Sequence, residues 1–161
     1  MATENYQDAI AQLGENYADE VLKLENQVCF PLYACSKEVV RRYTPYLDKL
    51  GITYTQYITL MVLWEQDGIT IGELGEKLLL DSGTLTPLLK KMESSGLVRR
   101  HRSEKDERRV VVSLTQAGRD LKEEAAKVPL EMASCVQLDP EEGAQLVYLL
   151  RKVLNNVRES R

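Results

Sequence analysis

Cys29 has a side chain that is suited to redox chemistry. It lies in the run LENQVCFPLY, residues 24–33, close to a predicted helix start. Peroxides are attacked by a thiolate rather than a thiol, and the positive end of a helix dipole favours the charged form. A lone cysteine in an apolar stretch is, however, usually a small packed side chain. The residue types therefore permit a redox switch without requiring one.

A second group of residues, between positions 70 and 115, is suited to DNA binding. Two short predicted helices, residues 71–78 and 83–95, precede two strand-like runs, residues 97–102 and 109–114. This order is typical of a winged helix–turn–helix, whose second helix enters the major groove. The predicted DNA-binding residues are Ser82, Thr84, Thr86, Lys90, Lys91, Arg102, Lys105, Asp106, Arg108 and Arg109.

The distribution of charge agrees with this prediction. Residues 90–109 hold eight basic and four acidic residues, a net charge of +4, whereas the rest of the chain carries −8 and the whole chain −4. A basic block on an acidic body is the footprint of a small DNA-binding element. Within it, Asp106 is predicted to orient the Arg108 guanidinium rather than to contact DNA. The alternatives are a solvated hairpin or a winged helix that binds a protein.

The elements around these residues are predicted to be mainly helical, with a small β-hairpin wing. Apolar residues recur at helical spacing over residues 20–43, where Pro31 indicates either a helix start near Cys29 or a kink. Thr44, before Pro45, is predicted to end that helix. The predicted caps of the later helices are, in chain order, Thr53 or Thr55, Thr70, Asp81 or Ser82, Thr115 and Asp139.

Three further patterns concern the later helices and the hairpin. The helix after Thr115 is predicted to extend to about residue 131 with a kink at Pro129. Alternation over residues 110–114 predicts a half-buried strand. The predicted buried face of the second reader helix is formed by Leu85, Leu88, Leu89 and Met92.

Composition excludes several classes of protein. The chain of 161 residues has 43% hydrophobic and 29% charged residues, no run long enough to span a membrane and no secretory signal. Three cysteines are an odd number, so we expect a reduced, cytoplasmic protein rather than a disulfide framework. One histidine and no Cys-x-x-Cys give no credible metal site, and we expect no cofactor.

Four segments of the chain resemble those of MarR-family repressors. Residues 75–93, GEKLLLDSGTLTPLLKKME, are similar to that family's DNA reader, and DERR at 106–109 with VSLT at 112–115 resembles its wing. LENQVCF at 24–30 and GITYTQY at 51–57 resemble the branch that senses organic hydroperoxides. Residues 24–115 are covered closely, and the last two helices fit by pattern. Pro31, Cys35 and residues 1–23 depart from the family pattern.

The resemblance implies a homodimeric repressor that releases its operator when organic hydroperoxide oxidises Cys29. It implies dimerisation helices at residues 20–50 and 116–161 and a winged helix–turn–helix domain at residues 51–115. The polar residues 1–19 are predicted from their composition to form an N-terminal arm. Tyr43 and Tyr54 match the tyrosines that hydrogen-bond the thiolate, one of them from the partner subunit.

The same resemblance implies a route for the oxidised sulfur. Cys29 would form a sulfenic acid and then, in some members, a disulfide with Cys135 of the partner subunit, which we favour over resolution by a small cellular thiol. Cys35 follows Cys29 by six residues, about 9 Å along a helix and on its opposite side, so a disulfide between the two would require the helix to unfold. We therefore expect Cys35 to be a packed core residue. The predicted apolar peroxide pocket is formed by Phe30, Leu32, Tyr33 and Trp64.

Two other functions fit parts of the sequence. In a ligand-responsive MarR repressor, a phenolic or lipophilic compound would release DNA and Cys29 would be inert. In a thiol peroxidase, Cys29 would turn over peroxides, but no general acid is apparent beside it and the DNA reader would have no purpose. We therefore expect a regulator and not an enzyme.

Overall fold

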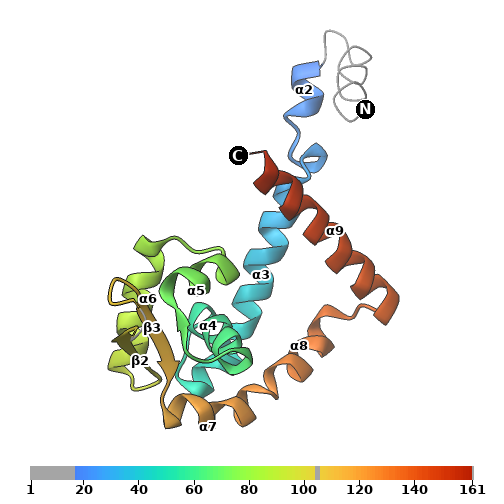
Figure 1. The fold of residues 1–161 in the computed structure, drawn as a ribbon. Coiled ribbons are helices and arrows are strands. Elements are labelled where there is room, and N and C mark those ends of the chain that lie inside the picture. The colour runs from blue at the N-terminus through green and yellow to red at the C-terminus, as the bar shows by residue number, and fades with distance from the viewer. Residues whose placement is uncertain (1–16, 104–105, 161) are drawn as a thin grey trace. The chain divides into compact units, whose positions relative to one another are not determined.

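The computed structural model describes residues 17–103 and 106–160. Lys105 and most of the predicted arm lie outside the described residues. The chain divides into two compact units, residues 1–42 (unit 1) and residues 43–161 (unit 2). The described part of unit 1 contains the short helix α2 (Tyr17–Val21), a 3₁₀ turn, η2 (Leu24–Asn26), and the first part of the long helix α3 (Cys29–Leu47), all shown in Figure 1.

Helix α3 decides between the two predictions for Pro31. The helix begins at Cys29, so Pro31 lies in its first turn, where the missing N–H is not needed. The predicted end at Thr44 is wrong, because α3 continues through Pro45 to Leu47. Leu47 is buried, and this packing offsets the hydrogen bond that proline removes.

The turn that follows α3 reverses the chain. A 3₁₀ turn, η3 (Asp48–Leu50), ends at Gly51, whose φ of 69° is left-handed. The Ile52 amide donates to the Leu47 carbonyl over 3.1 Å, which closes the turn. Glycine adopts this conformation without a steric penalty.

Three helices of unit 2 form the predicted reader. They are α4 (Tyr54–Glu65), α5 (Ile71–Leu78) and α6 (Ser82–Ser94). Thr53 with Gln56, and Thr70 with Glu73, form reciprocal capping boxes at α4 and α5. Asp81 caps α6, so the structure selects Thr53 and Asp81 from the predicted alternatives. Figure 1 shows α5 and α6 beside the β2–β3 hairpin.

The described residues contain one antiparallel sheet with strand order β1-β3-β2. Its strands are β1 (Ile69–Thr70), β2 (Val98–Arg102) and β3 (Val110–Leu114), with Arg100 opposite Val112. The prediction of a half-buried alternation in β3 is wrong: Val112, Ser113 and Leu114 are all buried. β3 is the central strand and pairs with β1 on one edge and β2 on the other, and Gly68 lies close to the Ser113 hydroxyl.

The core of unit 2 is formed where α4, α5 and α6 meet the sheet. Leu85, Leu89 and Met92 are fully buried as predicted, whereas Leu88 is only half-buried. Burial of each such side chain contributes about 1.5–3 kcal/mol. The other fully buried large side chains are Leu47, Leu60, Leu63, Leu74, Val98 and Val112.

The C-terminal region contains α7 (Gln116–Ala125), α8 (Val128–Val136) and α9 (Pro140–Glu159). The predicted single helix to residue 131 is therefore two helices, broken before the expected kink. Pro129 lies at the start of α8, where proline is accommodated without the loss of a helical hydrogen bond. No helix in residues 17–103 or 106–160 is long and apolar enough to cross a membrane. Nor do those residues contain a group of three or more His, Cys, Asp or Glu that could hold a metal ion.

Candidate DNA-reading and thiol sites

The first turn of α6 presents hydroxyl groups held by its cap. The Asp81 carboxylate accepts hydrogen bonds from the Thr84 amide over 2.9 Å and from the Thr84 hydroxyl over 3.1 Å. These bonds, the backbone bond first, lower the pKa of Asp81. Ser82 and Thr84 are exposed, as are Lys90 and Lys91 one to two turns later. Thr86 is half-buried and so less available than predicted for a direct contact.

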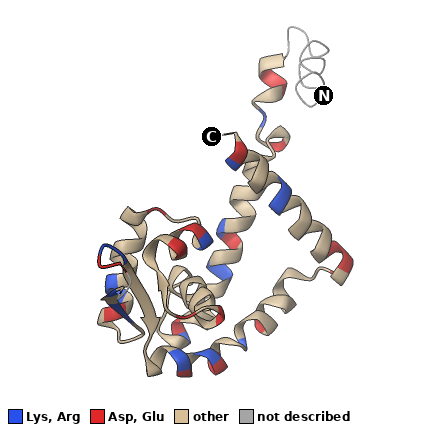
Figure 2. Cartoon of the chain, in the orientation of Figure 1, with Lys and Arg blue, Asp and Glu red and all other residues tan. Residues whose placement is uncertain are grey.

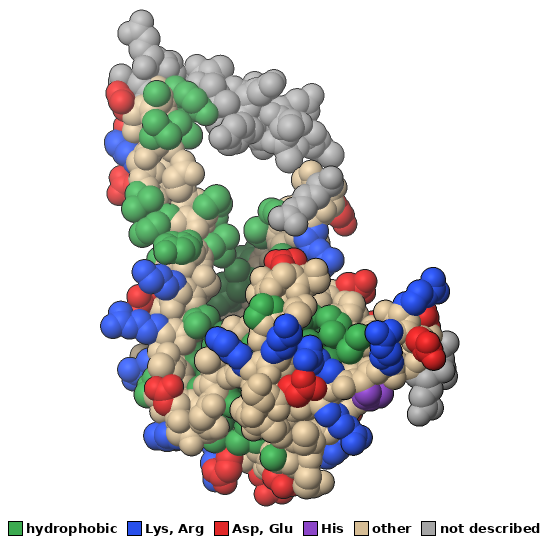
Figure 3. Space-filling view, turned by 90° about the vertical axis from the view of Figure 1, so that its left-hand side faces the viewer, with side chains coloured by type: hydrophobic (Ala, Val, Ile, Leu, Met, Phe, Trp, Pro, Cys, Tyr) green, Lys and Arg blue, Asp and Glu red, His purple; other side chains and the backbone are tan. Residues whose placement is uncertain are grey.

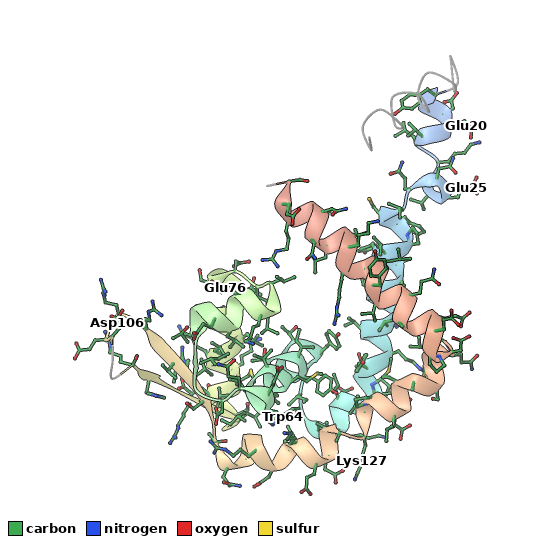
Figure 4. The ribbon with its side chains drawn as sticks, turned by 45° about the vertical axis from the view of Figure 1, so that its right-hand side comes forward. Glu20, Glu25, Trp64, Glu76, Asp106 and Lys127 are labelled. Carbon is green, nitrogen blue, oxygen red and sulfur yellow. The ribbon has the colours of Figure 1, made fainter. Side chains whose placement is uncertain are left out.

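The hairpin tip holds two arginines around one carboxylate. Arg108 donates to Asp106 Oδ1 through its amide and its Nε, both over 3.1 Å, and to Oδ2 through Nη2 over 3.4 Å. The Arg109 Nε lies 3.6 Å from Oδ2. The Arg108 side chain is 91% exposed, so Asp106 orients one edge of its guanidinium and leaves the rest accessible. This is the contact predicted from the sequence, and Figure 4 labels Asp106 at the tip.

Arg102 belongs to the turn as well as to the basic surface. Its Nη1 donates to the Glu107 carbonyl over 2.9 Å, and the Ser103 amide donates to the Arg109 carbonyl over 2.9 Å. Figure 2 shows basic and acidic positions mixed along this hairpin, and the space-filling view in Figure 3 shows lysine and arginine side chains on this part of the surface with acidic side chains between them. The surface is therefore mixed in charge and basic in balance.

An ion pair that the sequence analysis did not identify joins α6 to β2. Arg100 donates to the Glu93 carboxylate through its amide, its Nε and its Nη2, over 3.0, 3.1 and 2.6 Å. These hydrogen bonds lower the pKa of Glu93. The pair fixes the end of the reader helix against the wing. Opposite charges seven residues apart carry no distinctive signal, so only the fold reveals it.

In unit 1, Cys29 is the first residue of α3 and its side chain is exposed. Of its predicted neighbours, Phe30 and Tyr33 are also exposed and Leu32 is half-buried. Cys35 is exposed in the single chain, so the prediction that it packs in a core is wrong. The part of α3 in unit 1 has no buried residue, which explains this.

In unit 2, the two tyrosines predicted to stabilise the thiolate lie together. The Tyr43 and Tyr54 rings have centroids 5.0 Å apart at 63°, an edge-to-face pair. Burial, and then the neighbouring Tyr54, raise the pKa of Tyr43. A raised pKa keeps the phenol protonated and able to donate a hydrogen bond.

Tyr57 extends this pair and was not predicted. Its ring lies 6.0 Å from that of Tyr43 and 6.4 Å from that of Trp64, and burial raises its pKa. The indole N–H of Trp64 donates to the Gly118 carbonyl over 2.8 Å. The spacing of Tyr54 and Tyr57, three residues apart on one helix, is the signal that could have identified the cluster.

Cys135 lies in α8 and is half-buried. Its sulfur is 3.6 Å from the Glu131 carbonyl oxygen, one helical turn earlier. No disulfide joins the three cysteines, all of which are in the described part of the chain. The predicted pairing of Cys29 with Cys135 therefore stays a prediction.

Three helices on a small antiparallel sheet, with a charged hairpin after the second reader helix, define a winged helix–turn–helix DNA-binding protein. Residues 41–125 match the family profile described as transcriptional regulator SarA/Rot. The chain is 48% identical over 145 residues to the organic hydroperoxide resistance transcriptional regulator of Bacillus subtilis, spanning 90% of this chain and 98% of that protein.

Solved structures give the same assignment. The structure of reduced AbfR bound to DNA is similar with a TM-score of 0.76 and 33% identity, covering 91% of this chain and 99% of that one. A structure of disulfide-formed AbfR is similar with a TM-score of 0.61 and 35% identity, covering 86% and 98%. The chain belongs to the MarR-type winged-helix transcriptional regulators, in the organic hydroperoxide regulator branch. These matches confirm the predicted fold class and family. Because the family consists of transcriptional regulators, the protein is a DNA-binding regulator and not an enzyme.

Proposed function

We propose that this chain is a homodimeric repressor that binds operator DNA while Cys29 is reduced and releases it when an organic hydroperoxide oxidises Cys29. The observation that carries the proposal is the paired Tyr43 and Tyr54, found in a chain related to an organic hydroperoxide resistance regulator. A repressor of this kind acts in the cytoplasm, where its operator lies.

The chemistry begins at the start of α3. The Cys29 thiolate attacks one peroxide oxygen, an S–O bond forms and the O–O bond breaks, and the other oxygen leaves with a proton as an alcohol. The sulfur loses two electrons and the peroxide gains them. Cys29 is exposed at the start of α3 and is therefore accessible to a peroxide. Phe30, Leu32, Tyr33 and Trp64 are proposed as the apolar rim that favours organic peroxides.

The phenols of Tyr43 and Tyr54 are proposed to donate hydrogen bonds to the thiolate, one of them from the partner subunit. The raised pKa of Tyr43 supports this role, because it keeps that phenol neutral and able to donate. Oxidation replaces the thiolate with a sulfenic acid and weakens these bonds. The partner subunit's Cys135 thiolate would then attack the sulfenic sulfur, forming a disulfide and releasing water.

For DNA binding, we propose that the first turn of α6 enters the major groove and that the hairpin tip reaches an adjacent groove. Arg108 is the best-presented group, because Asp106 orients it and its side chain is exposed. The proposed contacts are those predicted from the sequence: Ser82, Thr84, Thr86, Lys90, Lys91, Arg102, Lys105, Arg108 and Arg109, with Asp106 as the orienting residue.

We propose that terminal helices, residues 20–50 and 116–161, form the dimer, with residues 51–115 as the reader. Helix α9 supports this, because none of its residues is buried in the single chain. Its large apolar side chains are between 41% and 62% exposed: Leu146, Val147, Tyr148, Leu149, Leu150, Val153, Leu154 and Val157. A second copy of the chain would cover this face.

The test is to titrate the reduced protein with cumene hydroperoxide while following its binding to the DNA upstream of its own gene. Wild type, Cys29→Ser and Cys135→Ser are compared, with Cys35→Ser as the control from the same helix as Cys29. We expect Cys29→Ser alone to retain DNA at all peroxide concentrations, and a disulfide-linked dimer on a non-reducing gel that requires Cys135. Release from Cys29→Ser as readily as from wild type would contradict the proposal and favour a small-molecule inducer.

A further inference from the structure

Helix α4 has aromatic side chains at both ends that contact different parts of unit 2. Tyr54, Tyr57 and Trp64 follow one stripe of the helix, at spacings of three and seven residues. At the N-terminal end, Tyr54 and Tyr57 contact Tyr43. At the other end, Trp64 contacts Tyr57 and α7. One helix therefore connects the proposed sensing tyrosines to the helix that follows the wing.

Trp64 is hydrogen-bonded to α7 at a closely packed position. Its indole N–H donates to the Gly118 carbonyl over 2.8 Å, and its own carbonyl accepts from Lys122 over 3.5 Å. Gly118 is itself pressed against the base of the wing, since a Cβ there would lie 2.2 Å from the Leu97 carbonyl oxygen. Figure 4 labels Trp64 at the end of α4 near α7.

Asp67, just after α4, makes a second attachment. Its Oδ1 accepts the Gly68 amide over 2.9 Å and the Leu114 amide over 2.8 Å, at the end of β3. Its Oδ2 accepts Arg119 Nη2 of α7 over 2.7 Å. A single carboxylate thus joins the turn after α4, the central strand of the wing and α7.

We propose that Trp64 and Asp67 are positioning residues that transmit a displacement of the sensing tyrosines to the wing. The inference rests on the proposed function, because the displacement is the one that oxidation of Cys29 causes. When Tyr43 and Tyr54 lose their thiolate partner and shift, Tyr57 and α4 shift with them. The attachments of Trp64 to Gly118, and of Asp67 to Leu114 and Arg119, carry the movement into β3 and α7 and turn the reader away from its half-site.

The test separates sensing from transmission. Trp64→Phe keeps a packed ring and removes the N–H donor, and Asp67→Asn keeps the shape and removes the charge. In Asp67→Asn we expect Cys29 to be oxidised at the wild-type rate, and in both variants we expect the reduced protein to bind DNA as wild type does. The ratio of oxidised to reduced Kd is expected to fall by about fivefold or more. This Kd ratio compares fully oxidised with fully reduced protein, so a changed oxidation rate in Trp64→Phe, whose ring is a proposed part of the peroxide pocket, does not alter it. Lys127→Gln, which removes the exposed pair with Glu124, is the matched control and should leave the ratio unchanged.

A second measurement does not depend on the variants. The Leu114 and Gly68 amides donate to Asp67, and bonds that carry the movement must stay closed, so their hydrogen exchange should stay at the reduced-state rate when the wild-type protein is oxidised. Accelerated exchange at both amides, or a wild-type Kd ratio in both variants, would overturn the inference. Equal loss of reduced and oxidised affinity would also overturn it, since that outcome indicates a structural role alone. Failure of the proposed function has a different sign, which is peroxide-dependent release of DNA from Cys29→Ser in the titration described above. In that case the inference fails as well.

Discussion

The Tyr43 and Tyr54 rings meet edge to face, 5.0 Å apart, although they come from different helices. The pair places two phenols side by side, both half-buried. Partial burial raises the pKa of Tyr43, which keeps that phenol protonated and able to donate a hydrogen bond to an anion.

Removing either phenol is expected to slow sensing. Tyr43→Phe or Tyr54→Phe deletes a hydrogen bond that is proposed to stabilise the thiolate, so oxidation of Cys29 should slow by about tenfold. Stopped-flow oxidation with cumene hydroperoxide measures the rate. Tyr46→Phe, on the same helix as Tyr43 and outside the ring pair, is the control. An unaltered oxidation rate in both variants would remove the tyrosines from the sensing site.

Asp106→Asn is expected to weaken operator binding by about fivefold, because Arg108 loses the partner that orients it. The pKa of Asp106 is lowered, first by its hydrogen bonds from Arg108. A lowered pKa means that the pairing is intact above the ordinary value of 3.8 and is lost only as the pH falls through the lower, folded value.

It follows that Asp106 contributes no pH dependence to DNA binding between about pH 5 and 8. Fluorescence anisotropy across that range tests this for wild type and Asp106→Asn. A difference between the two that grows or shrinks across the range would show that Asp106 titrates there, contrary to the structure.

The Glu93–Arg100 pair is expected to affect DNA binding without contacting DNA. Glu93→Gln or Arg100→Lys loosens the wing against α6 and should reduce affinity by about tenfold. The slope of log Kd against log salt should stay at the wild-type value. Lys90→Gln, which removes a proposed phosphate contact, should lower that slope by about one. A slope change in Glu93→Gln equal to that in Lys90→Gln would argue for a direct role.

Gly118→Ala is expected to destabilise the fold by about 1–3 kcal/mol, because its Cβ would overlap the Leu97 carbonyl oxygen. Gly143→Ala is the matched control. A Cβ at Gly143 meets nothing within 4 Å, and alanine is the better helix former by about 1 kcal/mol. Urea unfolding of the two variants should therefore give changes of opposite sign.

The sequence predicted the features that depend on neighbours in the chain. Capping at Thr70 and Asp139, the stop at Gly96 and the hairpin are local signals, and the structure has each of them. The Asp106–Arg108 contact spans two residues and was predicted for the same reason.

Features that depend on distant partners were missed. Strand β1 has two residues and exists because β3 pairs with it. Helix α3 passes Pro45 because Leu47 is buried, which no local pattern indicates. The sequence analysis did not group Tyr57 and Trp64 with the Tyr43–Tyr54 pair, because only the fold brings these rings together.

The Glu93–Arg100 pair has one more consequence, which concerns solubility. Within the described residues, β2 is the outer strand of the sheet next to α6, and an outer strand with free amides can recruit another chain. The outward amide of Arg100 donates instead to Glu93 over 3.0 Å. The same carboxylate that holds the wing against α6 therefore occupies an outward amide in the middle of β2, which makes this edge of the sheet less able to pair with another chain.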